Sequence, residues 1–230
     1  MLFRQLFEVE TSTYTYLLAD SSTQEAVLID PVKKLVPRYI KLLDELQLKL
    51  IHAIDSHVHA DHVTALGELR NLTGCKTYIG RDGSVACSDS SLEEGMLITF
   101  GNYGLKARYT PGHTDDSYCF ELKGAGRKAV FTGDTLLIRG SGRTDFQNGS
   151  SRQLYQSLHE VLLQLDDDTE VYPAHDYNGM TVSSIGEERQ HNPRLQWDLE
   201  EFVDRMSKLD LPNPKFLDIA VPANNQCGNV

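Results

Sequence analysis

A dense group of side chains that can bind a metal ion occupies six consecutive residues, 57–62. The run reads His57-Val58-His59-Ala60-Asp61-His62 and therefore holds three imidazoles and one carboxylate. Burying so many of these groups without a cation would be costly, so a purely structural role is disfavoured. Imidazole nitrogens and carboxylate oxygens together are typical ligands of zinc and of non-haem iron. The run predicts a metal centre.

Further candidate ligands follow later in the chain, each just beyond a short apolar stretch: His113, Asp134 and His175. Sheet proteins commonly gather their functional groups in the loops that follow strands. Gly112 and Gly133 directly precede two of the candidates and would permit tight turns there. The histidines that lack this context are interpreted as structural: His52, His159 and His191.

The apolar stretches have the lengths of short strands, and amphipathic segments alternate with them. Strands are expected over 2–9, 14–19, 26–29, 50–54, 76–79, 96–100, 105–109, 117–122, 128–131 and 170–172. Helices are expected over 37–46, 62–72 and 153–165, and over most of the chain after residue 181. Pro37 suits the first turn of one helix, and Gly74 suits the end of the next.

Strands and helices alternate in both halves of the chain. This pattern predicts an α/β protein in which two sheets pack face to face with helices outside, a four-layer αββα sandwich. A length of 230 residues can form one large domain, so a single domain over 1–230 is expected. Residues 176–230 are expected to be a short C-terminal extension that completes the substrate pocket.

The composition is that of a globular protein, with 40% apolar residues, 24% charged residues and a formal net charge of -11. Net acidity argues against nucleic acid or an anionic membrane surface as the main partner. No apolar run is long enough to span a bilayer. An anionic small molecule would need local arginines in such a protein.

The first residues of the chain lack the basic stretch and apolar core of a secretory signal, so a cytoplasmic location, in a bacterium, is expected. The cysteines form no Cys-x-x-Cys pair, which favours reduced thiols over a disulfide framework. They are Cys75, Cys87, Cys119 and Cys227.

The spacing of the motif over 57–62, with His113, Asp134 and His175 downstream, resembles the metal-binding signature of the metallo-β-lactamase superfamily. That superfamily has the αββα fold, so the resemblance implies the architecture already expected from the pattern of elements. Its members include hydrolases, oxygen-using enzymes and nucleases, and the fold therefore leaves the reaction open.

Sequence outside the shared signature separates the two nearest branches. Glyoxalase II thioester hydrolases usually hold two metals, whereas persulfide dioxygenases hold one iron. The run Gly142-Arg143-Thr144-Asp145-Phe146-Gln147 resembles persulfide dioxygenases, and glyoxalase II typically has Gly-Cys-Gly-Arg-Phe-Phe-Glu at this place. Further segments are similar to the same family: 172–177, 187–189 with 192–195, and 218–224 with 227–228.

The resemblance implies that His57, His113 and Asp134 bind one Fe(II) per chain. Two histidines and one carboxylate leave open positions for substrate and O2, as in non-haem iron oxygenases. The other signature residues would orient the ligands and iron-bound water by hydrogen bonds. They are His59, Asp61, His62 and His175. On chemistry alone, a second metal held by Asp61, His62 and His175 stays an alternative.

The implied substrate is glutathione persulfide, which O2 and water would oxidise to sulfite with release of glutathione. Arg143 and Arg194 are the candidates for binding its carboxylates, because the planar guanidinium suits bidentate recognition. Alternatively, Arg143 is an ion-pair partner of Asp145, and Arg194 is a helix-surface residue.

The remaining candidates for the substrate site lie in the last quarter of the chain. Tyr177 is expected to donate a hydrogen bond near the reacting sulfur, and Asn224 to contact the peptide part of the substrate. Cys227 is expected to lie near the pocket, although its reactivity cannot be judged without its environment.

Other functions are weighed against this one. A dinuclear glutathione-thioester hydrolase would use its metals to activate water. A non-enzymatic binding module would be favoured by a missing ligand, but every ligand position is filled. A nuclease is disfavoured because the chain is acidic and has no extended basic stripe. A homodimer is left open.

Overall fold

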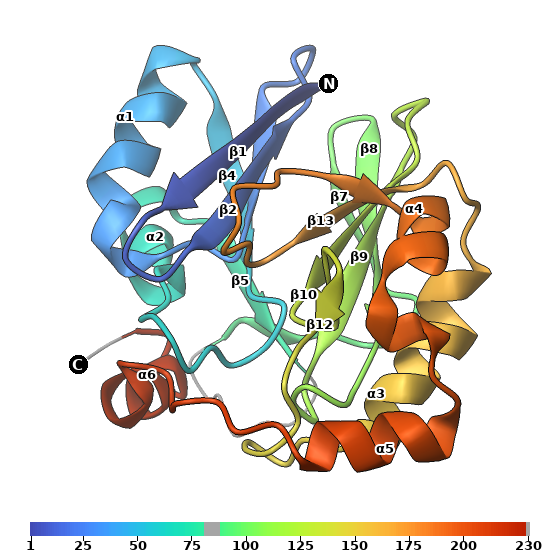
Figure 1. Ribbon diagram of the computed structural model, residues 1–230. Coiled ribbons are helices and arrows are strands. Elements are labelled where there is room, and N and C mark those ends of the chain that lie inside the picture. Colours follow the sequence, from blue (N-terminus) through green and yellow to red (C-terminus); the bar gives the residue numbers. More distant parts are fainter. Residues whose placement is uncertain (81–87, 229–230) are drawn as a thin grey trace. The chain divides into compact units, whose positions relative to one another are not determined.

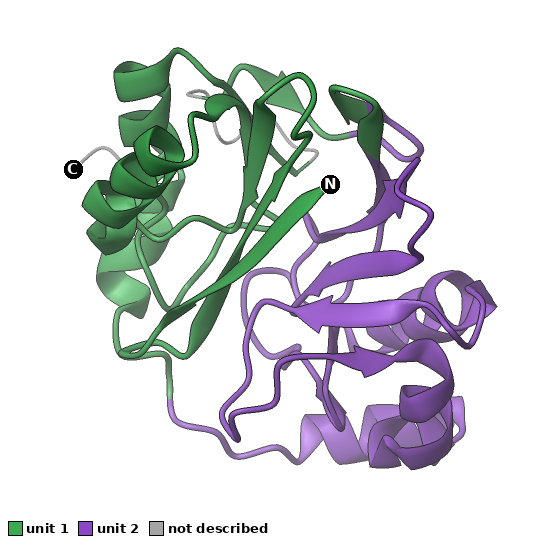
Figure 2. Cartoon of the chain, turned by 90° about the horizontal axis from the view of Figure 1, so that it is seen from above, with its two compact units in different colours: residues 1–92, 98–104, 213–230 green, residues 93–97, 105–212 purple. Residues whose placement is uncertain are grey.

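The computed structural model describes residues 1–80 and 88–228 (Figure 1). They group into two compact units, which are coloured separately in Figure 2. The first unit contains residues 1–92, 98–104 and 213–230, and the second contains 93–97 and 105–212. The described residues form two six-stranded sheets and one two-stranded ribbon.

The sheet of the first unit has the order β1-β2-β3-β4-β5-β6. Its strands are Leu2–Glu8 (β1), Thr13–Ala19 (β2), Glu25–Ile29 (β3), Lys49–Ile54 (β4), Lys76–Ile79 (β5) and Ser90–Ser91 (β6). β1, β2 and β3 form an antiparallel meander, whereas β4, β5 and β6 each add in parallel. The strands expected in this part of the chain are confirmed within one or two residues at each end.

Helices α1 (Val36–Glu45), α2 (Leu66–Thr73) and α6 (Leu217–Asn224) belong to the first unit. A short 3-10 turn, Lys33–Leu35, leads into α1. Apolar residues of β2, β3 and β4 pack with residues of α1 and α2 in one hydrophobic core. That core includes Leu17, Leu28, Ala53, Tyr39 and Leu69.

α2 ends as expected but begins later. Gly74 follows it with a left-handed φ of 72°, which suits glycine. The helix starts at Leu66, and the prediction that it begins at His62 is wrong. The reason is that the backbone groups of residues 63–65 bond elsewhere, since Val63 O accepts from Lys33 N and Ala65 N donates to Pro31 O.

The second six-stranded sheet has the order β14-β13-β10-β9-β8-β7. Its strands are Leu97–Phe100 (β7), Tyr103–Tyr109 (β8), Tyr118–Lys123 (β9), Ala129–Gly133 (β10), Glu170–Pro173 (β13) and Ser183–Ser184 (β14). β10 pairs in parallel with β13 and antiparallel with β9. Leu136–Leu137 (β11) and Gly140–Ser141 (β12) form a separate two-stranded ribbon.

Helices α3 (Ser151–Gln156), α4 (Ile185–His191) and α5 (Leu199–Ser207) belong to the second unit, and a 3-10 turn, Pro193–Gln196, joins α4 to α5. The helix expected over 153–165 exists in three pieces, because α3 continues as a π-helical turn, Ser157–Val161, and a 3-10 turn, Leu162–Gln164. These helices pack with β9, β10 and β13 in a hydrophobic core that includes Val130, Leu154, Val171, Ile185 and Phe202.

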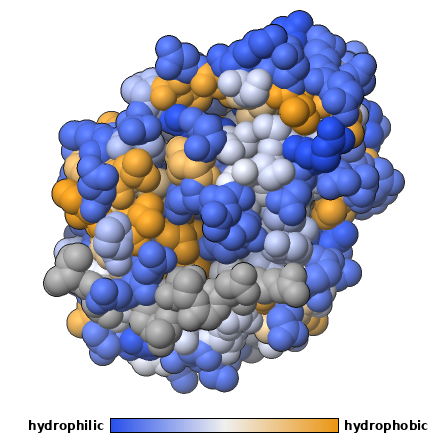
Figure 3. Space-filling model, turned by 90° about the horizontal axis from the view of Figure 1, so that it is seen from below, coloured by the Kyte–Doolittle hydropathy of each residue, from blue (hydrophilic) through white to orange (hydrophobic). Residues whose placement is uncertain are grey.

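Among the described residues, no helix is long and apolar enough to cross a membrane. Hydrophilic residues cover most of the face drawn in Figure 3, and hydrophobic residues appear there in smaller groups. This surface agrees with the acidic, charged composition of the chain.

Candidate metal centre

The carboxyl ends of β3 and β4 position the first group of candidate ligands. Ile29 pairs with Ile54 in the parallel register, and Asp30 N donates a hydrogen bond of 2.8 Å to Ile54 O. Asp30 therefore lies beside the segment that leads from β4 to His57. The His57 ring is buried, and its Nδ1 lies 3.0 Å from Ser56 Oγ.

Asp30 contacts the segment that carries these candidate ligands. Its Oδ1 accepts a hydrogen bond of 2.6 Å from Ser56 N and lies 3.1 Å from His59 Nε2. Burial raises the pKa of this carboxyl group above its usual value, although the Ser56 N–H acts in the opposite direction. Asp30 was not singled out from the sequence. Asp30 directly follows an apolar strand, as Asp134 does, and this position could have identified it from the sequence.

His59, Asp61 and His62 form a compact set on the same unit. Each offers one ligand atom, and these atoms lie within 4.8 Å of one another. His62 Nδ1 lies 3.0 Å from Asp61 Oδ2, and its buried Nε2 has no hydrogen-bond partner among the described residues. Such a nitrogen is costly to bury alone, so the set is chemically competent to hold a cation.

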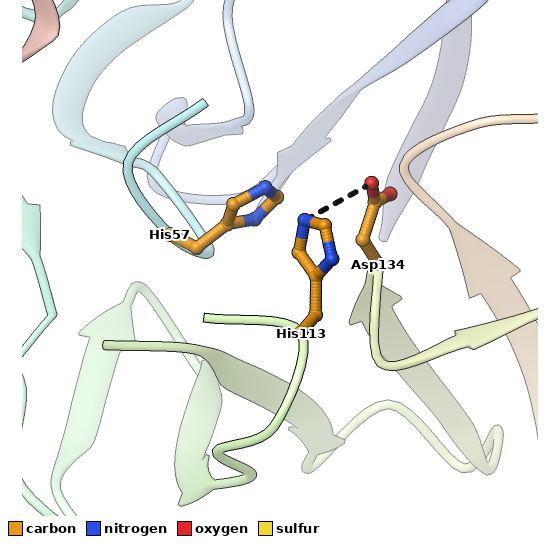
Figure 4. A group of neighbouring side chains, drawn as sticks. All are labelled: His57, His113 and Asp134. Carbon is orange, nitrogen blue, oxygen red and sulfur yellow. Dashed lines mark ion pairs between the residues drawn. The ribbon is translucent and has the colours of Figure 1, made fainter. Parts of the chain in front are cut away.

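In the second unit, strand register brings the later candidates together. Gly133 pairs with Pro173 in the parallel register of β10 and β13, and Asp134 and His175 follow these positions. His113 lies in the loop that precedes β9, whose first residues lie near the end of β10 because these strands are antiparallel. His175 Nε2 is 3.7 Å from Asp134 Oδ1. His113 Nε2 is 3.6 Å from Asp134 Oδ2, and Figure 4 marks this pair with a dashed line.

One contact decides which nitrogen of His113 can bind a metal. Nδ1 lies 2.7 Å from Arg143 O, and a carbonyl oxygen only accepts, so Nδ1 carries the proton. In the neutral ring, Nε2 then has a lone pair that faces the Asp134 carboxylate. The separation of 3.6 Å exceeds a hydrogen bond, and a cation between the two would be attracted by both. The donor set fits a divalent metal.

Close packing around these ligands depends on glycine. A Cβ at Gly112, where φ is 140°, would lie 2.2 Å from Leu154 N. A Cβ at Gly142 would lie 2.3 Å from Asp134 O and 2.7 Å from His113 Nδ1. Gly142 was not among the predicted site residues, although it opens the Gly-Arg-Thr-Asp-Phe-Gln run that carries the family resemblance.

The three residues that the resemblance implies as iron ligands belong to different units: His57 to the first, and His113 and Asp134 to the second. Figure 4 draws all three and marks the ion pair between His113 and Asp134 with a dashed line.

Arg143 is engaged within the protein. Its Nε and Nη2 each donate a hydrogen bond of 2.6 Å to Asp145, and its Nη1 donates one of 2.7 Å to Pro212 O. This ion pair holds the pKa of Asp145 below its usual value. The prediction that Arg143 clamps a substrate carboxylate stays a prediction. The ion pair with Asp145 is the alternative that the sequence also allowed, and it fixes the backbone whose carbonyl orients His113.

Arg194 differs, because among the described residues it has no carboxylate partner. Its Nη1 donates hydrogen bonds of 2.7 Å to Ser141 O and 2.9 Å to Ser141 Oγ. Burial lowers the pKa of the guanidinium, as expected for a charge without an acid beside it. Arg194 lines a cavity of about 320 Å³ together with Trp197, Arg205, Met206, Lys208 and Leu209. Its other nitrogens are available to an anion.

The other predicted substrate residues have different environments. Tyr177 is 71% exposed, and its ring stacks on His175 with a centroid separation of 6.0 Å. Asn224 is fully buried, and its amide bonds to the backbone of His59, His62 and Thr64. The Asn224 amide is thus used inside the first unit, and the prediction that Asn224 contacts substrate stays a prediction.

Cys227 is buried in the core of the first unit and is disulfide-bonded. The expectation of a reduced thiol is therefore wrong for this residue, because spacing along the chain does not record disulfide pairing. The expectation that Cys227 lies near the pocket stays a prediction. Cys75 and Cys119 are free thiols, as expected, and Cys87 lies outside the described residues.

Comparison with known proteins defines the class. The Metallo-beta-lactamase superfamily matches residues 9–175. The structure titled ETHE1 from Myxococcus xanthus is similar with a TM-score of 0.95 and 51% identity, and the match covers 100% of both chains. The chain therefore belongs to the metallo-β-lactamase superfamily, and the αββα fold class expected from the sequence is confirmed.

The sequence relatives narrow the family further. The chain is 50% identical over 229 residues to "Persulfide dioxygenase ETHE1, mitochondrial" of Homo sapiens, covering 99% of this chain and 89% of the relative. It is 34% identical over 165 residues to a hydroxyacylglutathione hydrolase of Francisella tularensis subsp. novicida, covering 71% of this chain and 63% of that protein. Within the superfamily, the chain belongs to the persulfide dioxygenase family, as its sequence motifs indicate.

Proposed function

We propose that the chain is an iron-dependent persulfide dioxygenase that oxidises glutathione persulfide with O2 and water to sulfite and glutathione. The similarity to a persulfide dioxygenase across 99% of the chain carries this proposal. In the reaction the sulfur–sulfur bond breaks, and glutathione leaves as a thiol. The outer sulfur loses four electrons, which O2 accepts, and the three oxygens of sulfite come from O2 and water.

His57, His113 and Asp134 would hold one Fe(II) per chain. Two imidazoles and one carboxylate are the donor set of non-haem iron oxygenases. When bound, iron would supply the redox chemistry that allows O2 to react with the sulfur of the substrate. The orientation of His113 by Arg143 O supports this assignment, because it presents Nε2 rather than Nδ1 toward Asp134.

The surrounding residues would orient the ligands and the reactants. His59, Asp61, His62 and His175 would form hydrogen bonds to the ligands and to water. Arg194 would bind a carboxylate of glutathione, because it is the partly buried arginine with free donors. Tyr177 would donate a hydrogen bond near the reacting sulfur. Through Tyr177 and Arg194, residues 176–230 would complete the pocket of a single domain.

Location and assembly stay predictions. A cytoplasmic, bacterial setting is proposed from the sequence, whereas the human relative is named as mitochondrial. A homodimer is likewise only a prediction.

A dinuclear glutathione-thioester hydrolase is the second candidate. The set formed by His59, Asp61 and His62 favours it, because these residues could hold another metal. Two metals would activate a water molecule for attack on a thioester. The hydrolase relative is less similar and matches a smaller part of the chain, so this candidate ranks below the dioxygenase.

One paired experiment tests the proposal. The protein is purified without oxygen, its metal content is measured, and O2 consumption is followed with glutathione persulfide as substrate. We expect one iron per chain and formation of sulfite as O2 is consumed. Two zinc ions per chain without O2 uptake, together with anaerobic hydrolysis of S-lactoylglutathione, would favour the hydrolase instead.

A further inference from the structure

The C-terminal helix α6 contacts the loop that carries the metal-binding motif, and both belong to the first unit. Asn224, the last residue of α6, uses its side-chain amide for three hydrogen bonds to that loop. Its Nδ2 donates to His59 O and His62 O, each at 2.8 Å. Its Oδ1 accepts from Thr64 N, also at 2.8 Å. The amide is completely buried.

The residues that follow Asn224 make further contacts within the first unit. Gly67 N donates a hydrogen bond of 2.9 Å to Cys227 O, and Lys33 Nζ donates one to Gly228 O. A Cβ at Gly228 would lie 2.1 Å from Thr64 O, so the backbones are closely packed. The position of Asn224 relative to the loop is therefore fixed by several independent contacts.

The loop needs such a partner because residues 59–62 form neither a helix nor a strand. A buried backbone N–H or C=O without a partner is costly. Two carbonyls and one N–H require a side chain with two donors and an acceptor close together. The amide of asparagine supplies them in one rigid plane, whereas aspartate would place an oxygen opposite two carbonyl oxygens.

We infer that Asn224 is a positioning residue of the metal centre. It fixes the backbone of residues 59–64, and so keeps His59, Asp61 and His62 in their orientations before any metal binds. Asn224 acts through the loop and touches neither metal nor substrate. The inference rests on the proposed function only in assuming that the motif over 57–62 serves a metal centre.

The test compares three variants with the natural protein. Asn224→Asp keeps the shape of the side chain, and Asn224→Ala removes all three hydrogen bonds. Asn102→Ala is the matched control, because the Asn102 amide donates to Asp20 and Ser22 in the same unit but away from the metal-binding motif. Two quantities are measured: the dissociation constant of Fe(II), by competition with a chelator, and hydrogen exchange of residues 59–66 in the metal-free protein.

We expect both Asn224 variants to weaken Fe(II) binding about 10- to 100-fold, as for other residues that support metal ligands. Exchange over 59–66 should accelerate, and Asn102→Ala should change neither quantity. Saturating Fe(II) should restore turnover of Asn224→Asp with an unchanged KM for glutathione persulfide. An unchanged Fe(II) dissociation constant with a raised KM would overturn the inference and return Asn224 to the substrate site.

A measurement on the natural protein covers the case in which the variants do not fold. In the metal-free protein, the Thr64 amide should be as protected from exchange as the amides of α6. Rapid exchange of Thr64 in the folded metal-free protein would contradict the inference. If the natural protein binds metal but consumes no O2, the proposed function fails, whereas these binding and exchange results still decide the role of Asn224.

Discussion

At the scale of single residues, the contacts that a side chain already makes within the protein decide which of its atoms can bind a metal or a substrate. His113 can present Nε2 to a metal because Nδ1 donates to Arg143 O. Arg143 and Arg194 have the same guanidinium group, but Arg143 is paired with Asp145, whereas Arg194 donates to Ser141 and has no carboxylate partner among the described residues. The sequence gives the type of each side chain, whereas these contacts decide which of its donors and lone pairs are left for a metal or a substrate.

Replacing His113 by Ala should reduce bound iron and sulfite formation to background, because one of the three proposed ligands would be lost. His52→Ala is the control, since His52 Nε2 contacts only the backbone of Thr99 among the hydrogen bonds described for it. Iron content is measured by metal analysis, and activity with an oxygen electrode. Full iron content and turnover in His113→Ala would show that the metal is held elsewhere.

Replacing Arg194 by Ala should raise the KM for glutathione persulfide by about 10- to 100-fold, because a hydrogen bond to a charged group contributes roughly 1.5–3 kcal/mol. Iron content should stay unchanged, since a carboxylate clamp mainly affects binding. Arg205→Ala is the control, because Arg205 lines the same cavity but is paired with Glu201. A parallel loss of iron in Arg194→Ala would indicate a structural role.

At the scale of elements, parallel strand pairs place the ligands and short loops hold them at close range. β3 and β4 end side by side at Asp30 and the motif, and β10 and β13 end side by side at Asp134 and His175. The turn after β12 then packs Gly142 directly against two of the ligands. A side chain larger than that of glycine at position 142 would therefore displace one of the candidate ligands.

Gly142→Ala should therefore lower iron content and activity at least about tenfold, because its Cβ would overlap Asp134 O and the His113 ring. Gly140→Ala is a matched control in the same ribbon, where the nearest atom to a Cβ is 3.9 Å away. Fe(II) affinity and the midpoint of thermal unfolding are compared for both variants. Equal behaviour of the two would mean that the loop adapts and that close packing at Gly142 is unimportant.

At the scale of the whole molecule, the proposed Fe(II) should stabilise the fold, because its ligands would be brought together in the native protein and not in the unfolded chain. At a free concentration of about 100 times the dissociation constant, binding contributes roughly 2.7 kcal/mol. For a chain of this size, that corresponds to a rise of about 5–11 °C in the unfolding midpoint.

Removal of iron with a chelator should lower the unfolding midpoint by that amount, and anaerobic addition of Fe(II) should restore it. Differential scanning calorimetry measures both midpoints at fixed protein and metal concentrations. Magnesium added at the same concentration serves as the control, because it prefers oxygen ligands. An unchanged midpoint after complete removal of iron would mean that the metal makes no net contribution to stability.

The sequence alone determined the candidate ligands, the succession of most strands and helices, and the family. These features are local, since a motif of six residues or an apolar strand is readable without its neighbours in space. The tertiary structure decided that Asn224 supports the metal-binding loop, that Asp145 occupies Arg143, that Cys227 is disulfide-bonded and that α2 begins only at Leu66. Each of these outcomes depends on contacts made in the folded chain, several of them between distant segments, and neither residue type nor spacing records which of the possible partners comes within hydrogen-bonding distance.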